Sequence, residues 1–138
     1  MDATRSVSTA LRVVGAIFVV FFVFAFVASA TKMTDPDLLY RMLGWGSPGD
    51  AEEQMLSIIY IFWGVFLWRA AKDPFKNGLF IDFTIAANVA HFALMAVQSL
   101  VMPGEHTHLY GDVLVGFIVI AILAVPWFAV RGAQRTPA

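Results

Sequence analysis

Four long uncharged runs constrain the fold of this chain more than any other feature. They cover residues 13–31, 54–68, 83–102 and 113–130. A helix needs roughly 20 apolar residues to cross the ~30 Å hydrocarbon core of a bilayer. The second run is short, and it reaches that length if Arg69 and Lys72 extend their charged ends to the membrane surface. We therefore predict an all-α polytopic membrane protein, a four-transmembrane-helix bundle.

The composition supports a membrane protein with one domain. Hydrophobic residues make up 59% of the chain and charged residues only 14%, whereas soluble proteins are about 25% charged. We expect a single domain, residues 1–138, with helices over approximately 11–31, 54–71, 79–102 and 110–130. The segment Ala28-Ser29-Ala30 would also suit a signal-peptide cleavage site. We expect no cleavage and therefore a retained first helix, because the apolar stretch that precedes Ala28 is long for a signal peptide.

The basic residues are distributed unevenly between the two ends of the predicted helices. Most lie at the chain ends and in the middle link, at Arg5, Arg12, Arg69, Lys72, Lys76, Arg131 and Arg135. The other two links contain only Lys32 and Arg41 among seven carboxylates. Cytoplasmic loops of membrane proteins are enriched in lysine and arginine. The asymmetry predicts that both termini are cytoplasmic.

The first outer link contains the pattern of a short helix. Asp35 is a suitable N-cap residue and Pro36 suits the first helical position. The apolar residues that follow share one face, namely Leu38, Leu39, Met42 and Leu43, and Gly44 ends the segment. We expect a short amphipathic helix in the first outer loop, lying on the membrane surface or over the mouth of the bundle.

The third apolar run carries polar or polarisable side chains at regular intervals. They recur at alternating steps of four and three, at Thr84, Asn88, His91, Met95, Gln98 and Met102. This spacing places all of them on one helix face. His91 lies near the middle of the run, and an ionisable group at that depth is a functional-site hypothesis by default. We therefore take His91, Asn88, Gln98, Thr84 and Met95 as candidate ligand- or proton-binding residues.

Three interpretations of His91 remain open. A neutral imidazole could donate a hydrogen bond to a backbone carbonyl or to a residue of the second helix such as Ser57 or Tyr60. A histidine titrates near physiological pH, which suits a proton relay or a ligand site. Ligation of haem or another metal is the third interpretation, because Ala87 leaves space one turn away. We expect no cofactor, with a metal ion or haem as the alternative.

A second group of polar residues precedes the fourth helix. His108 and Asp112 are four residues apart and share a helix face, with Glu105 and His106 just upstream. Histidine and carboxylate ligands suit zinc, manganese or copper(II). A weak metal site is therefore one hypothesis, and a solvated polar rim or a pH-sensing group are the others.

Two further features concern packing. The turn over residues 72–78 predicts that the second and third helices are antiparallel neighbours, which would bring Arg69 and Asp82 to one depth as a structural ion pair. The third helix also carries Ala86, Ala90 and Ala93 in a stripe of small residues. Such a stripe allows close approach of another helix.

The centre of the chain resembles a known family. The residues that carry the resemblance are Trp63-Gly64-Val65-Phe66-Leu67, Ala70 or Ala71, Pro74, Asn77, Ile81, Phe83-Thr84, His91, Met95 and Gln98. Together they look like a family of small bacterial four-helix integral membrane proteins of unknown function, over residues 60–100. Phe92 departs from the pattern, in which alanine is usual. The resemblance implies a bacterial origin and the four-helix fold, and it supplies no activity. We expect a location in the bacterial cytoplasmic (inner) membrane.

Several function classes are excluded and three remain. The chain has no cysteine, which excludes disulfides and thiolate chemistry, and its net charge of −1 offers no basic surface for nucleic acid. The leading hypothesis is a non-enzymatic accessory subunit or self-associating bundle, whose partners are the lipid bilayer and a second copy or other membrane-protein subunits. The alternatives are a carrier or sensor of a proton, ion or small ligand centred on His91, and a metal- or haem-binding redox protein.

Overall fold

The predicted all-α class is confirmed. The computed structural model describes residues 3–35, 37–44 and 51–135, and these contain helices and no strand. The elements are α1 (Ala3–Ala30), α2 (Asp37–Leu43), α3 (Ala51–Ala70), α4 (Gly78–Val101), the 3₁₀ helix η1 (Glu105–Leu109) and α5 (Asp112–Arg135). The short helix expected in the first link is α2, and Pro36, its predicted first residue, lies outside the described residues.

The long helices extend beyond the apolar runs that revealed them. α1 begins at Ala3 and α5 continues to Arg135, past the predicted limits of residues 11 and 130. An apolar run marks the depth of hydrocarbon that a segment can cross, whereas backbone hydrogen bonding continues into polar residues. Between α4 and η1, Gly104 turns the chain with φ +92°, a conformation that glycine adopts without strain.

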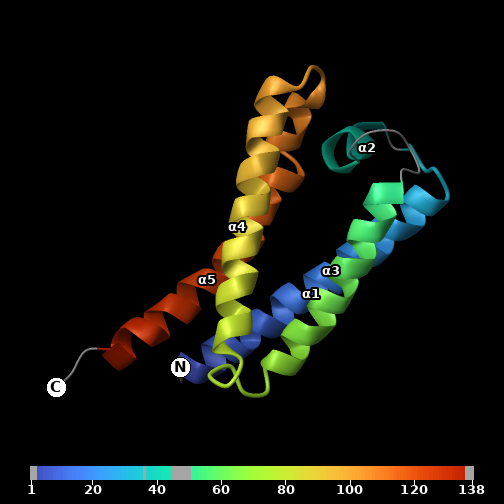
Figure 1. Ribbon diagram of the computed structural model, residues 1–138. Helices are drawn as coiled ribbons and strands as arrows, with labels where there is room; N and C mark the ends of the chain where they lie inside the picture. Colours follow the sequence, from blue (N-terminus) through green and yellow to red (C-terminus); the bar gives the residue numbers. More distant parts are fainter. Residues whose placement is uncertain (1–2, 36, 45–50, 136–138) are drawn as a thin grey trace.

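The four long helices form two pairs that diverge from a common base (Figure 1). α1 packs along α3, and α4 packs along α5. α3 and α4 are joined by a tight turn and contact each other through large side chains, such as the stacked rings of Trp63 and Phe83, without the close backbone approach of the other pairs. The predicted neighbours α3 and α4 therefore do touch, but the closer helix contacts include those within the pairs α1–α3 and α4–α5. The starts of α1 and α4 and the end of α5 lie toward the base.

The α1–α3 pair is held closely by two glycines. A Cβ atom built on Gly15 would lie 2.7 Å from the carbonyl oxygen of Gly64, and one built on Gly64 would lie 2.6 Å from that of Gly15. Either contact is too short for a side chain, so the two backbones approach each other here as small residues allow in membrane helices. Trp68 closes the same contact, since its Nε1 donates to the Arg12 carbonyl oxygen at 2.6 Å.

The buried apolar core lies at the base, where both pairs meet. All four long helices contribute to it, with Val7, Leu11 and Val14 from α1, Leu67 from α3, Ile81 from α4 and Ile120, Leu123 and Trp127 from α5. α1 and α5 pack directly against each other. Among the described residues, the outer halves of the two pairs contribute little to this core, which leaves room between them.

Three helices are long and apolar enough to cross a membrane. Among the described residues they are the helical segments Thr4–Ala30, Gly78–Val101 and Glu105–Gly132. α3 is 20 residues long, but Glu52, Glu53 and Arg69 occupy its ends, so it does not reach the same hydropathy. Large apolar side chains are exposed on every long helix, including Val20, Phe62, Leu94 and Val125. These features are those of a membrane protein.

Asp82 has a different partner from the one predicted. The guanidinium of Arg131 on α5 pairs with its carboxylate, and Trp127 Nε1 donates to Asp82 Oδ1 at 2.8 Å. Arg69, the expected partner, instead lies over the ring of Phe66. Trp127 and Arg131 are four residues apart and share a face of α5, and α4 packs on α5 at this level. The ion pair therefore ties α4 to α5.

We expect Asp82→Asn to lower the free energy of unfolding by about 1–2 kcal/mol, because it weakens hydrogen bonds made to a charged group. The size is modest, since roughly a third of each side chain remains exposed. Thermal unfolding in detergent measures the effect. Arg69→Gln is the control, and it should leave the unfolding temperature unchanged. Equal destabilisation by both substitutions would instead support the ion pair between Arg69 and Asp82 that the sequence predicted.

Candidate functional site

A large cleft opens between the two helix pairs. It has a volume of about 480 Å³ and is lined by residues of all four long helices and of α2. Its walls are mainly apolar, with the rings of Phe18, Phe21, Phe22 and Phe92. Polar groups are few, and they are Glu52, Glu53, Ser57, His91, Gln98 and Asp112. An apolar cavity with a small number of polar groups is the usual form of a small-molecule site.

The polar or polarisable residues predicted on one face of α4, from Thr84 to Met102, are called the α4 ladder below, and its two inner members are used for packing. Tyr60 Oη donates to Asn88 Oδ1 at 3.0 Å, and Trp63 Nε1 donates to Thr84 Oγ1 at 2.8 Å. Asn88 and Thr84 are fully buried, and their own donors bond backbone carbonyl oxygens one turn earlier. These two candidates therefore join α4 to α3, and they do not face the cleft.

The next three members of the ladder line the cleft. His91, Met95 and Gln98 follow one another outward along α4, while Met102 is exposed at its end. Within the described part of the chain, no hydrogen bond engages the His91 ring. Ser57 donates to the Glu53 carbonyl oxygen instead, so the hydrogen bond expected between His91 and α3 is not formed.

Aromatic rings fix the position of His91. Its ring centre lies 6.0 Å from that of Tyr60 and 5.3 Å from that of Phe92. Phe92 in turn packs against Gly116 of α5, where a Cβ atom would overlap its ring. The imidazole therefore stands between the two aromatic side chains at the wall of the cleft, where it can donate to or accept from a bound molecule.

The weak metal site, one of three hypotheses for the outer cluster, is not formed among the described residues. His108 is buried, and its Nδ1 and Nε2 lie 3.0 Å from Asp112 Oδ1 and 3.1 Å from Glu105 Oε2. His106 Nδ1 instead lies 2.6 Å from the Ser99 carbonyl oxygen. Over residues 3–35, 37–44 and 51–135, no three histidine or carboxylate side chains are arranged to hold a metal ion. Both nitrogens of His108 already face carboxylates, so this group joins η1 to α5.

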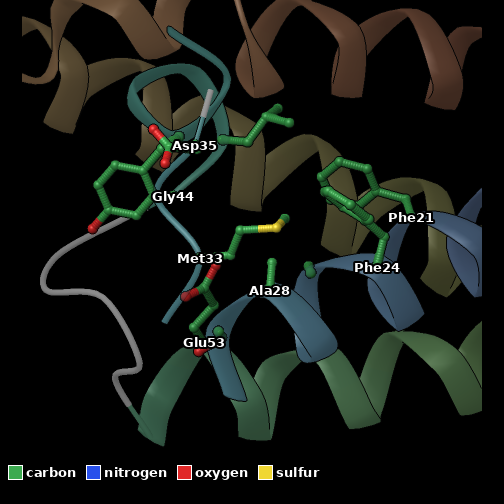
Figure 2. A pocket seen from close by; sticks show the side chains of 11 residues that line it. Phe21, Phe24, Ala28, Met33, Asp35, Gly44 and Glu53 are labelled. Carbon is green, nitrogen blue, oxygen red and sulfur yellow. The ribbon is translucent and has the colours of Figure 1, made fainter. Parts of the chain in front are cut away.

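A smaller pocket adjoins the cleft beneath α2. Its volume is about 50 Å³, and it shares Phe21, Ala25, Leu43 and Glu53 with the cleft. Figure 2 shows Asp35 and Glu53 on one side of it and the rings of Phe21 and Phe24 on the other. The two cavities are therefore neighbouring parts of one outer vestibule.

The position of α2 depends on a glycine. A Cβ atom on Gly111 would overlap the carbonyl oxygen of Met42 at the end of α2, so only glycine allows this contact. α2 packs there against η1. Leu43, the next residue, lines both cavities. The short helix thus covers the outer side of the vestibule, which corresponds to one of the two positions predicted from the sequence, over the mouth of the bundle.

Sequence reasoning missed the contribution of α1. Phe18, Phe21, Phe22 and Ala25 line the cleft, but α1 has no polar residue between Gly15 and Ala28 that would mark a face. The available signal was the density of phenylalanine itself. In an apolar helix, rings that face a cleft and rings that face lipid cannot be told apart from their spacing alone.

The comparisons with known proteins agree with the predicted resemblance to an uncharacterised family. The chain matches a family of unknown function, DUF6632, over residues 3–138, well beyond the region that carried the resemblance. No curated protein matches the chain, and no solved structure does. The protein belongs to the family of unknown function DUF6632.

Proposed function

We propose that this is an integral membrane protein that binds a lipophilic small molecule in the cleft between its helix pairs. This is the function of a carrier or sensor, with His91 at the wall of the binding site. The observation that carries the proposal is the cleft itself, whose apolar walls enclose a short line of polar groups from His91 to Gln98. A molecule with an apolar body and a polar end suits such a cavity.

The membrane environment strengthens this interpretation. A polar side chain in hydrocarbon is costly unless it is hydrogen-bonded. The inner ladder residues Thr84 and Asn88 meet this requirement within the protein. His91 faces the cleft without a hydrogen bond to any described residue, so a bound molecule that hydrogen-bonds its imidazole would remove this cost. Because the inner residues hydrogen-bond within the protein and His91 does not, the outer part of this helix face favours a bound ligand over simple packing.

We further propose that all four long helices span the membrane, with both termini in the cytoplasm. α3 has 20 residues, which corresponds to roughly 30 Å of helix. Its glutamates and Arg69 would then lie at the two surfaces, where the long arginine side chain can reach water. The clustering of basic residues at one end of the helices favours this orientation.

The absence of native cysteine allows a direct test of the topology. We expect a membrane-impermeant maleimide to label Thr34→Cys in intact spheroplasts, and to label Lys76→Cys only after the membrane is opened. Both residues are exposed, and α3 lies between them. Labelling of both variants from one side would mean that α3 does not cross the membrane.

The cleft can be tested with a neutral long-chain alcohol that carries a photoreactive diazirine. We expect saturable labelling of the peptides that contain Phe92 and Met95. Ala25→Phe fills the vestibule and should weaken this labelling by about tenfold, which corresponds to roughly 1.4 kcal/mol of binding free energy. Ala121 lies exposed on α5 outside the cleft, so Ala121→Phe is the matched control. Unchanged labelling of Ala25→Phe would exclude the cleft as the binding site.

Self-association remains a second candidate, since Ala86, Ala90 and Ala93 of α4 are all exposed. Small residues on an exposed helix face favour close contact between two copies. We expect light scattering of the purified protein in detergent to give the mass of a dimer, and Ala90→Leu to shift it toward the monomer. Ala121→Leu serves as the control. A monomeric wild type would remove this candidate.

A further inference from the structure

One face of α1 lines both cavities from the middle of the helix to its outer end. Its residues recur at steps of four, three and four, at Phe18, Phe22, Ala25 and Ser29. This spacing places them on one side of the helix. Phe18 and Phe22 line the cleft, Ala25 lines both cavities, and Ser29 lines the adjoining pocket. The face therefore changes from aromatic to small to polar toward the outer end of the vestibule.

The hydroxyl of Ser29 is buried without a partner among the described residues. Ser29 is 4% exposed, and its Oγ makes no hydrogen bond to any of them. By contrast, the hydroxyls of Ser57 and Thr84 bond the backbone carbonyl oxygen one turn earlier in their helices. Buried polar groups are usually hydrogen-bonded, and an exception calls for an explanation. Because Ser29 borders a cavity, a bound molecule with a hydrogen-bonding group can supply the missing partner.

His91 is a second polar group of the vestibule, and it lies deeper than Ser29. It is near the level of Phe22, because both rings neighbour Tyr60, at ring-centre distances of 6.0 Å and 4.2 Å. Ser29 follows Phe22 by seven residues, and α1 runs from the base toward the outer end. Seven residues correspond to a rise of about 10 Å along a helix. The vestibule therefore offers hydrogen-bonding groups at two depths, separated by roughly this rise.

The surroundings of these two groups favour an uncharged molecule. Within the described ranges no lysine or arginine lines either cavity, so an anion would find no basic partner there. Asp112 is already paired with His108, and Glu53 also has a partner, so a cation would gain little from them. Glu52 and Asp35 are exposed, where water and salt screen their charges. A charge without a partner in an apolar cavity costs far more than a neutral hydrogen-bonding group does.

We propose that the vestibule binds an uncharged, elongated lipophile with a hydrogen-bonding group at each end, such as a long-chain diol. The outer group bonds the Ser29 hydroxyl, the apolar body passes Ala25, and the inner group bonds the His91 imidazole. The inference rests on the proposed function and adds the number and the spacing of the polar groups of the ligand. A molecule with one polar end leaves either Ser29 or His91 without a partner, whereas a molecule with two polar ends satisfies both.

Two alcohols with the same carbon chain test the number of polar ends. Decanol has a hydroxyl at one end of its chain, and the corresponding decanediol has one at each end. Each competes with the photoreactive alcohol for labelling of the full-length protein in a neutral maltoside detergent, and its concentration is measured within the micelles. We expect half-maximal competition at a micellar concentration about tenfold lower for the diol, which corresponds to roughly 1.4 kcal/mol.

Single substitutions locate the two ends of the ligand. Ser29→Ala and His91→Leu should each reduce the advantage of the diol to about twofold or less, because each leaves one hydroxyl of the diol without a partner. Ser29→Ala removes no hydrogen bond to a described residue, so its unfolding temperature should not fall. A loss of binding in this variant is then separate from a loss of folding. If His91→Leu does not fold, Ser29→Ala decides the question.

Ser99→Ala is the matched control. The Ser99 hydroxyl is also buried without a described partner, but Ser99 lines neither the cleft nor the adjoining pocket. This variant should retain the full advantage of the diol. An equal loss in Ser99→Ala and Ser29→Ala would overturn the assignment of the outer end to Ser29, because the removal of any buried hydroxyl would then have the same effect.

The outcomes separate this inference from the proposed function. If the photoreactive alcohol labels the cleft but the diol competes no better than decanol, the two-ended ligand is wrong and the proposed function stands. A diol advantage that Ser29→Ala retains also overturns the inference, because the second hydroxyl would then bind elsewhere. If the photoreactive alcohol does not label the cleft at all, the proposed function fails as well.

Discussion

Two hydrogen bonds set the distance between the helix pairs, and the cleft depends on that distance. Tyr60 and Trp63 reach from α3 to Asn88 and Thr84 of α4. Their rings fill the space that a close helix contact would remove, and Phe18 and Phe22 of α1 pack against them (ring centres of Phe22 and Tyr60 4.2 Å apart). In hydrocarbon such bonds have few competitors, because lipid tails offer neither donors nor acceptors.

The aromatic contacts also separate the molecule into two parts with different packing. Toward the base, all four long helices share a buried core, and the Asp82–Arg131 pair joins α4 to α5. Toward the outer end, the short helix α2 connects the two pairs, since it packs against η1, which in turn packs on α4 and α5. A rigid base and a loosely joined outer end suit a site that admits molecules from the membrane or from its surface. Regions with few buried contacts are also those that open most readily.

Sequence reasoning succeeded where one helix determines the outcome. Apolar runs located the four long helices, and the spacing of Thr84, Asn88 and His91 placed them on one face of α4. It failed where the outcome depends on how two helices meet. Arg69 matched Asp82 in depth, but α4 turns Asp82 toward α5, where Arg131 lies.

The outer cluster illustrates the same limit in a different way. The sequence brought Glu105, His108 and Asp112 together correctly as neighbours, but it could not show that one buried imidazole would engage both carboxylates. A metal site needs nitrogen or oxygen lone pairs that converge on one point, and hydrogen bonding within the cluster directs them toward each other. Only the three-dimensional arrangement separates these two uses of the same residues.

The α4 ladder explains why the cleft is difficult to interpret as a mere packing defect. If the gap between the helix pairs were filled by lipid tails alone, His91 and Gln98 would face hydrocarbon, and each such polar group costs several kcal/mol unless it is hydrogen-bonded. The inner half of the same face avoids this cost by bonding Trp63 and Tyr60, whose side chains are long enough to bridge the gap. Farther out the helix pairs diverge beyond that reach, and α3 offers Ser57, whose hydroxyl bonds its own backbone. Polar groups on this part of α4 are therefore best accounted for by a partner that enters the cleft and carries hydrogen-bonding groups of its own.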